Sequence, residues 1–101
     1  MASEQPLEFH PEALAELERA QAWYEAQRPG LGESFFQEIT TAVSRIREAP
    51  NTWPEYRQGT RRFLVHRFPF AVIYCQRATS LLIMAVMHLK QRPGYWQARL
   101  R

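Results

Sequence analysis

The sequence predicts an α+β fold with the element order β-α-α-β-β-β, in which an antiparallel helical hairpin packs on a mainly antiparallel sheet and a short C-terminal tail follows. Two observations predict it. The second half contains three short apolar runs separated by breakers, which favour strands. The first half contains two segments whose apolar residues recur at helical intervals. Since a three-stranded meander buries a face only when another layer covers it, the helices should supply that cover.

The first elements are a short strand and a helix. Residues 6–9 place two apolar side chains on one face of an edge-strand candidate. Pro11 then suits the first position of a helix, because it lacks the N–H that the first turn leaves unpaired. Apolar residues recur at intervals of three and four over the following turns. The helix should end near Gln27, because Arg28 precedes a proline and therefore avoids the α region.

A second amphipathic helix is expected from about Gly32 to Ala49, with Ile39 and Ile46 on its apolar stripe. A glutamate lies in its first turn and two arginines lie near its end, which is the arrangement that the helix dipole favours. Pro50 ends it. The short connection between the two helices predicts an antiparallel hairpin.

Three strands should follow, at Phe63–Val65, Phe70–Cys75 and Leu81–Leu89. The connections between them are short, so two hairpins are expected, the first at a proline that cannot donate to a ladder. One face of this meander should pack on the helices. We expect the following side chains to be buried there: Leu14, Leu17, Phe35, Ile39, Val43, Ile46, Val72 and Ile73.

Length and composition limit the possible functions. A chain of 101 residues predicts a single domain over residues 1–101, too small for a cleft between two lobes. The single cysteine excludes a disulfide framework and suits the reducing cytoplasm, and no apolar run is long enough to predict a membrane span. No glycine-rich phosphate loop is present, and the three histidines lack the spacing of a metal site, so no cofactor or metal is expected.

The net charge of +3 conceals an asymmetry between the two halves. Residues 1–50 contain nine Glu and four Arg, whereas residues 51–101 contain one Glu, eight Arg and one Lys. Guanidinium groups bind carboxylates and phosphates through two hydrogen bonds, so the basic half suits either an acidic protein segment or a nucleic acid. The candidate binding residues are Arg77, Lys90, Arg92, Tyr95 and Trp96.

The same half contains parts of a ribonuclease site. Cleavage of RNA without metal needs a base, an acid and cations near the phosphate. His88 at a strand end, with Arg61, Arg62 and Arg67, could supply them, which leaves a metal-independent endoribonuclease open. As an alternative, His88 could simply form a hydrogen bond at the strand end.

Aromatic residues also have two interpretations. Trp53 and Tyr56 lie in the loop before the meander, where packing of the loop is favoured over a platform that stacks nucleobases. Trp96 could belong to a binding surface, or the tail could hold it against the core.

Taken in order, these motifs resemble the RelE/ParE superfamily of toxins from type II toxin–antitoxin systems, in particular its ParE-like branch of plasmid stabilisation proteins. The resemblance covers nearly the whole chain. The residues that carry it are Phe9–Ala13, Trp23–Tyr24, Arg28–Gly32, Phe35, Trp53–Pro54, Gly59, Arg61–Phe63, Arg67–Phe70, Ile73–Tyr74, Ala85–His88 and Arg92–Trp96.

The resemblance implies a toxin that a cognate antitoxin neutralises, with oligomers formed through that antitoxin. It implies one of two activities, because the superfamily contains inhibitors of DNA gyrase and ribosome-dependent mRNA endonucleases. The ribonuclease branch usually carries Arg or Lys on the middle strands, whereas Phe70–Gln76 carries no cation. This departure favours inhibition of an essential target such as DNA gyrase by binding. An mRNA endoribonuclease and a non-toxic binding module remain alternatives.

Overall fold

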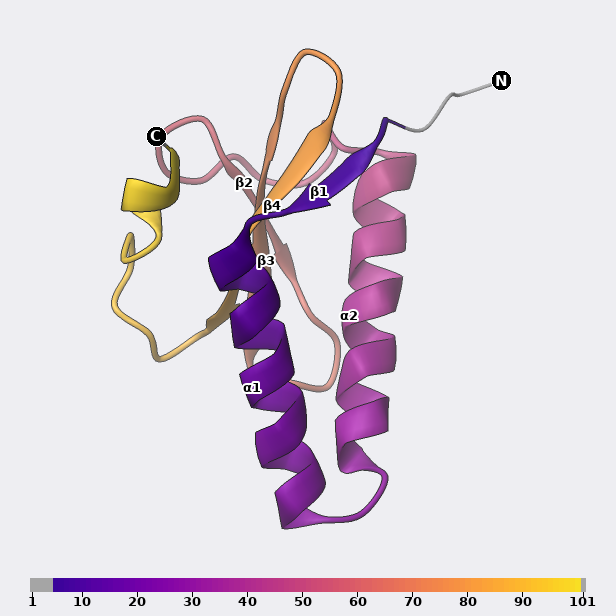
Figure 1. Ribbon diagram of the computed structural model, residues 1–101. Coiled ribbons are helices and arrows are strands. Elements are labelled where there is room, and N and C mark those ends of the chain that lie inside the picture. The colour runs from indigo at the N-terminus through magenta and orange to yellow at the C-terminus, as the bar shows by residue number, and fades with distance from the viewer. Residues whose placement is uncertain (1–4, 101) are drawn as a thin grey trace.

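The computed structural model describes residues 5–100 and has the expected α+β class and element order (Figure 1). Residue 101, at the end of the expected tail, lies outside the described residues, as do residues 1–4. No helix of the described part is long and apolar enough to cross a membrane. The elements are β1 (Leu7–Phe9), α1 (Pro11–Gln27), α2 (Leu31–Glu48), β2 (Arg61–Leu64), β3 (Phe70–Gln76), β4 (Leu81–His88) and the 3-10 helix η1 (Gln97–Leu100).

The four strands form one sheet in the order β1-β4-β3-β2. The pairs β2–β3 and β3–β4 are antiparallel, which confirms both expected hairpins. The strand β1 instead lies parallel to β4, with Leu7 opposite Leu81 and Phe9 opposite Ile83. Since β1 ends there, no strand among the described residues pairs with β4 on that side beyond Ile83.

Local chemistry explains why the helices begin and end where they do. The His10 side chain caps α1, since its Nδ1 accepts a hydrogen bond from the Glu12 N–H at 3.1 Å. In the turn between the helices, Gly30 has a φ of +89°, and the Glu25 carboxylate accepts from the N–H groups of Gly30 and Gly32 at 2.9 and 3.0 Å. A Cβ at Gly32 would lie 2.7 Å from the backbone of α1, so the close approach of the helices requires glycine.

The two helices run antiparallel and cover one face of the sheet (Figure 1). Large apolar side chains of α1 and α2 meet those of β3 and β4 in this layer, as the helical periodicity predicted. Phe35, Ile39 and Ile46 of α2 are almost completely buried. The other buried members of this core are Ala13, Leu17, Ala42, Val65, Phe68, Phe70, Val72, Tyr74, Leu81, Ile83 and Val86.

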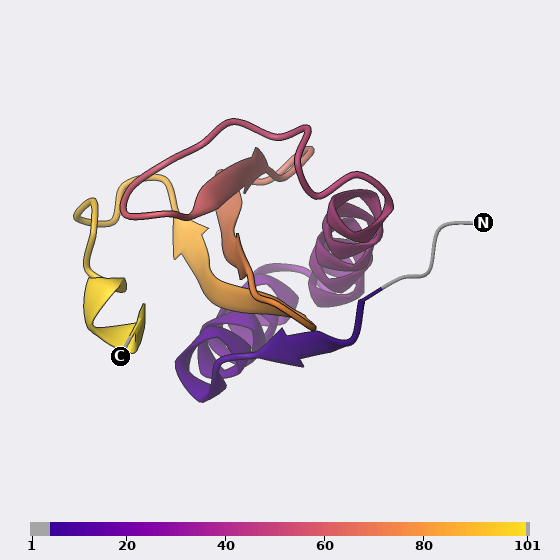
Figure 2. The same cartoon turned by 90° about the horizontal axis from the view of Figure 1, so that it is seen from above.

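The other face of the sheet is covered by the C-terminal segment and the loop before β2, and Figure 2 shows this segment on the far side from α2. A second cluster of apolar side chains fills the space beneath them. Because both faces are covered, nearly every residue of β3 and β4 is buried. The buried residues of the second cluster are Ala71, Ile73, Leu82, Met84, Ala85, Met87 and Trp96.

Two expectations for the helix-covered face were wrong. Ile73 is buried, but in the cluster on the opposite face, because neighbouring residues in a strand point to opposite sides and Val72 already faces the helices. Leu14 is 43% exposed, since no element within residues 5–100 lies over that side of α1. Val43 of α2 is half-buried and packs against the core, so its expected burial is confirmed in part.

Candidate functional site

A buried polar cluster joins α1, β4 and the C-terminal segment, and we call it the Glu16 clamp. The Glu16 carboxylate accepts hydrogen bonds from the Tyr95 O–H at 2.6 Å, from both terminal nitrogens of Arg99 at 2.9 and 3.0 Å, and from the Val86 N–H at 3.0 Å. Arg99 also donates to the Met84 carbonyl at 3.0 Å. The side chains of Glu16 and Arg99 are only 11% and 13% exposed. The clamp therefore provides hydrogen-bond partners for the Val86 N–H and the Met84 carbonyl, on the edge of β4 that β1 does not reach.

Two residues that were predicted to bind a partner, Tyr95 and Trp96, instead make contacts within the protein. Burial, and then the hydrogen bond to Glu16, raise the pKa of Tyr95, so its hydroxyl remains a donor within the fold. Trp96 is 0% exposed, which confirms the interpretation that the tail holds it against the core. The sequence did not indicate Glu16 or Arg99, because no local pattern links side chains 83 positions apart.

Arg61 and Arg62 lie next to each other on β2 but on opposite faces of the sheet. Arg61 donates to the Trp53 carbonyl at 2.7 Å and lies 3.5 Å from the Glu55 carboxylate. Arg62 stacks over the Tyr56 ring at 4.8 Å on the other face. The Trp53 ring packs edge-on against another aromatic ring at 4.7 Å, so packing of this loop is confirmed. Both guanidinium groups thus contact the loop before β2.

His88 and Arg67 lie near the opposite end of the sheet. The His88 ring packs edge-on against Phe70 at 5.0 Å, and its Nδ1 accepts from the Lys90 N–H at 3.0 Å. Arg67 occupies a turn with a φ of +74°, and its guanidinium lies over the neighbouring Phe68 ring at 5.5 Å. His88 is therefore a strand-end residue with a structural hydrogen bond.

The pairing of the strands separates Arg61 from His88, while Arg67 lies at the His88 end. Arg61 lies opposite Tyr74 and His88 lies opposite Phe70, so their partners are four positions apart along β3. That spacing corresponds to roughly 13 Å along the strand, at about 3.3 Å per residue. A base and cations that act on one phosphate must lie within hydrogen-bond reach of it. The structure does not bring His88 and Arg61 together in this way.

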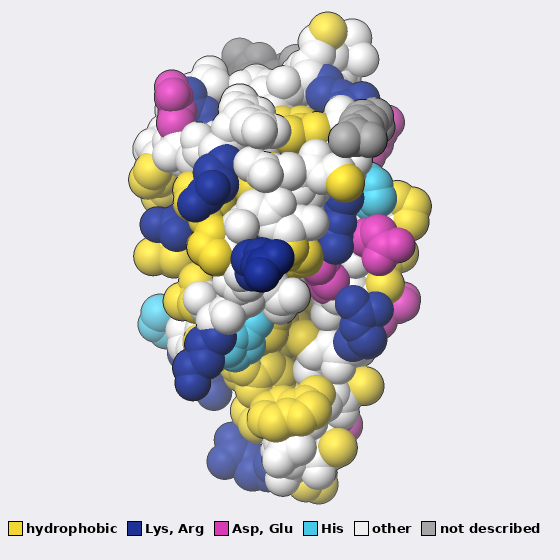
Figure 3. Space-filling view, turned by 90° about the vertical axis from the view of Figure 1, so that its left-hand side faces the viewer, with side chains coloured by type: hydrophobic (Ala, Val, Ile, Leu, Met, Phe, Trp, Pro, Cys, Tyr) yellow, Lys and Arg dark blue, Asp and Glu magenta, His cyan; other side chains and the backbone are white. Residues whose placement is uncertain are grey.

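The exposed members of the predicted binding set also lie in two places. Arg77 is in the turn between β3 and β4, whereas Lys90 and Arg92 follow β4 at the other end of the sheet. Figure 3 shows basic side chains, histidine and apolar groups close together on the face that includes the C-terminal segment. Lys90 and Arg92 therefore share the His88 end of the molecule.

An apolar groove lies along α1, α2 and β1, and we call it the α1–α2 groove. It has a volume of about 300 Å³ and almost no polar surface. Leu14 and Phe36 are its exposed walls. Its lining residues are Leu7, Phe9, Leu14, Leu17, Phe36, Ile39, Thr40 and Val43. The groove thus includes Leu14 and Val43, which the sequence predicted for the core and which no element of the described part of the chain covers completely.

A second hollow lies where α1 meets the end of β4, and we call it the Trp23–His88 surface. It has a volume of about 450 Å³ and is also mostly apolar. Trp23 is 60% exposed and forms its outer wall. Its lining residues are Ala20, Trp23, Tyr24, Pro69, Phe70 and His88. Trp23 is among the residues that carry the family resemblance, but no binding role was predicted for it. The signal that marks it is its exposure, which periodicity does not give.

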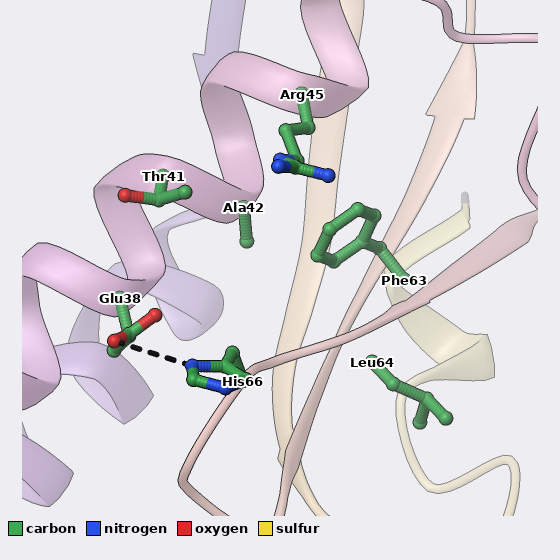
Figure 4. Close-up of a pocket in the computed structure, with 7 residues that line it drawn as sticks. All are labelled: Glu38, Thr41, Ala42, Arg45, Phe63, Leu64 and His66. Carbon is green, nitrogen blue, oxygen red and sulfur yellow. Dashed lines mark ion pairs between the residues drawn. The ribbon is translucent and has the colours of Figure 1, made fainter.

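A third pocket, of about 480 Å³, separates α2 from β2 (Figure 4). His66 points toward Glu38, with 3.6 Å between Nδ1 and Oε2, whereas Arg45 extends toward Phe63. The imidazole is mostly exposed, so this contact contributes little to the stability of the fold. Within residues 5–100, no three side chains of His, Cys, Asp or Glu converge as metal ligands would.

Comparison with known proteins agrees with this fold. The family model described as "ParE toxin of type II toxin-antitoxin system, parDE" matches residues 7–93. A solved structure, the "Chromosomal ParDE TA system from P. aeruginosa", superposes with a TM-score of 0.76 at 19% sequence identity, covering 86% of this chain and 98% of that one. No curated protein sequence matches the chain significantly. The match over most of the described residues shows that the chain belongs to the ParE toxin family of type II toxin–antitoxin systems.

Proposed function

We propose that a cognate antitoxin neutralises this toxin, and that the free toxin inhibits an essential target such as DNA gyrase by binding it. Family membership and the likeness to a ParDE toxin–antitoxin system support an antitoxin partner. The gyrase target rests on the family resemblance alone.

The observation that carries the antitoxin part is the α1–α2 groove. Leu14 and Phe36 are exposed there beside apolar residues of β1 and α2. Contiguous apolar surface of this kind on a small protein marks a site for a partner. An amphipathic helix can lay its apolar face in such a groove and cover these side chains. The groove is therefore the site that we assign to the antitoxin.

The separation of the cationic side chains supports binding over cleavage. Arg61 and Arg62 lie on opposite faces of β2, and His88 lies at the far end of the sheet. Of the candidate arginines, only Arg67 lies at the His88 end, so the strand register does not favour one phosphate site for the whole set. A ribosome-dependent mRNA endoribonuclease remains the competing activity.

Expression of the chain alone and with the product of its neighbouring gene tests this function. The chain alone should arrest growth, and the neighbour's product should relieve the arrest and raise the melting temperature of the chain, because it binds only the folded state. Phe36→Ala should weaken that complex at least tenfold, so that relief is lost. Leu64→Ala, an equally apolar change on β2 outside the groove, is the matched control.

Two results would contradict the proposal. If the wild-type chain causes no growth arrest, the alternative of a non-toxic binding module replaces it. If Phe36→Ala binds the neighbour's product as tightly as wild type does, the antitoxin occupies another surface.

A further inference from the structure

We propose that the Trp23–His88 surface is a second docking site, which receives an acidic protein segment with an apolar or aromatic anchor. This inference rests on the proposed function, in which that segment belongs to the toxin's target. The site is separate from the α1–α2 groove, since the residues that line the two hollows have no member in common.

The exposed anchor of this surface rests on a ring that is packed into the core. Trp23 packs edge-on against Tyr24 at 5.2 Å. The Tyr24 ring in turn contacts Phe35 at 5.2 Å, Phe68 at 4.8 Å and Phe70 at 6.2 Å, which fixes it to the core. An exposed tryptophan that packs against a fixed ring loses little conformational entropy on binding. Tryptophan is also common among the residues that contribute most of the binding energy at interfaces.

His88 adds one directed polar group to the apolar wall. Its Nδ1 accepts from the Lys90 N–H, so in the neutral ring the hydrogen lies on Nε2, which can donate. Its contact with Phe70 fixes the orientation of the ring. An apolar hollow with an oriented donor suits an apolar side chain next to a carbonyl or carboxylate oxygen.

The charges around the surface favour an acidic partner. Three cations are exposed near the ends of strands that border the surface: Arg67 in the turn before β3, and Lys90 and Arg92 after the end of β4. Residues 56–101 contain no Asp or Glu. On α1, the carboxylates of Glu16 and Glu25 already accept hydrogen bonds within the protein, and the exposed Glu12 and Glu18 are not among the residues that line the hollow. A negatively charged segment would therefore gain attraction at the border of the hollow while its anchor fills the centre.

A protein segment suits this site better than a nucleic acid does. Apolar side chains form most of the lining, which includes no Lys or Arg, and Arg67 and Lys90 lie two residues away in sequence from lining residues. Nucleic acids are held chiefly through phosphates, which need several cations or N–H groups converging on the strand. A base could stack on Trp23, but its phosphate would meet few donors in the hollow itself.

The test uses the purified full-length chain and three probes. These are a random copolymer of glutamate and tyrosine, polyglutamate without an aromatic anchor, and a single-stranded oligothymidylate. The copolymer should bind most tightly, with an affinity that falls as salt rises. Trp23→Ala should weaken its binding at least tenfold, while Leu64→Ala, with 58% exposure on the far strand β2, should leave it unchanged. His88→Phe keeps the ring contact but removes the donor, so it should weaken binding by a smaller factor, about 3- to 10-fold.

Equal copolymer binding by wild type and Trp23→Ala would overturn the inference. Tighter binding of oligothymidylate that depends on Trp23 would also overturn it, in favour of a nucleic-acid site. Growth arrest distinguishes the inference from the proposed function. If the copolymer binds through Trp23 but the wild-type chain arrests no growth, only the proposed function fails. If Trp23→Ala folds and arrests growth as fully as wild type, only the docking site fails.

Discussion

Trp96 and Trp23 both pack against other aromatic rings, yet their surroundings differ in kind. Trp96 is 0% exposed, lies between Tyr56 and the sheet, and belongs to a segment that the Glu16 clamp holds in place. Trp23 is 60% exposed, and nothing in the described part of the chain covers its outer side. The same residue type therefore stabilises the fold in one region and remains available to a partner in the other.

The two tryptophans therefore have the opposite roles to those that their segments suggest: Trp96 is part of the core, and Trp23 is exposed. A basic, aromatic tail looks like a binding element, but the clamp turns it inward. A helix with a regular apolar stripe looks like a core element, but one side of α1 is left uncovered. Variants that separate stability from binding can test this assignment.

The largest effect is expected for Trp96→Ala. Removal of a fully buried indole should lower the free energy of unfolding by about 3 to 5 kcal/mol. Ile39→Ala, beneath the helices on the other face, should cost about 2 to 5 kcal/mol and serves as the reference for an ordinary core position. Urea denaturation measures both. A Trp96 variant with the wild-type midpoint would mean that the tail is not part of the folded core.

Glu16→Gln should have the next largest effect. It leaves the buried guanidinium of Arg99 without its counter-charge, and loss of one partner from a buried ion pair typically costs about 3 kcal/mol or more. Glu18→Gln, on the exposed side of the same helix, should change stability by less than about 0.5 kcal/mol. Equal midpoints in urea for the two variants would exclude the clamp as a stabilising element.

High pH should weaken the fold through its buried tyrosines. Burial raises the pKa of Tyr74 to about 12, and burial together with the Glu16 hydrogen bond also raises that of Tyr95 above its usual value of 10. The unfolded chain loses these protons near pH 10 while the folded chain keeps them. Stability should therefore be full below pH 10 and fall between pH 10 and 12, by about 1 kcal/mol per pH unit for each tyrosine.

Tyr95→Phe isolates the contribution of the clamp to this pH dependence. The variant should show a shallower fall in melting temperature above pH 10 than wild type does. An identical slope would show that the Tyr95 hydroxyl titrates as it does in the unfolded chain, and therefore that it is not enclosed by the clamp.

Trp23→Ala should have the smallest effect on stability. The exposed indole loses little surface on folding, so the free energy of unfolding should change by about 0.5 kcal/mol or less, measured in the same urea series. A loss comparable to that of Trp96→Ala would mean that Trp23 supports the fold, and the contrast between the two regions would disappear.

Periodicity and breakers predicted most of the fold. The helix bounds followed from Pro11, Pro29 and Pro50, and the hairpins from the spacing of the apolar runs. Periodicity could not show that β1 pairs parallel with β4, because strand partners are decided by the chain's path in space. It also could not assign adjacent residues such as Val72 and Ile73 to the two faces of a sheet that is covered on both sides.

Less of the candidate site could be predicted from the sequence. His88, Lys90 and Arg92 were recognised as neighbours because they are close in the chain. Arg61 and Arg62 were grouped with His88 because all lie in the basic half, but the register of β2, β3 and β4 separates them. The exposure of Trp23 and the burial of Glu16 were not predicted, since both depend on segments distant in sequence.

The central claim, that this toxin acts by binding and not by cleavage, is tested most directly by adding the purified, antitoxin-free chain to two reactions in parallel. One is DNA supercoiling by gyrase, and the other is translation of a defined mRNA by ribosomes. The account predicts inhibited supercoiling, intact mRNA, and a His88→Ala variant whose potency falls by no more than about tenfold, the effect of one lost contact. Ribosome-dependent cleavage of the mRNA that His88→Ala reduces by about 10² or more, the effect of a lost general acid or base, would contradict it.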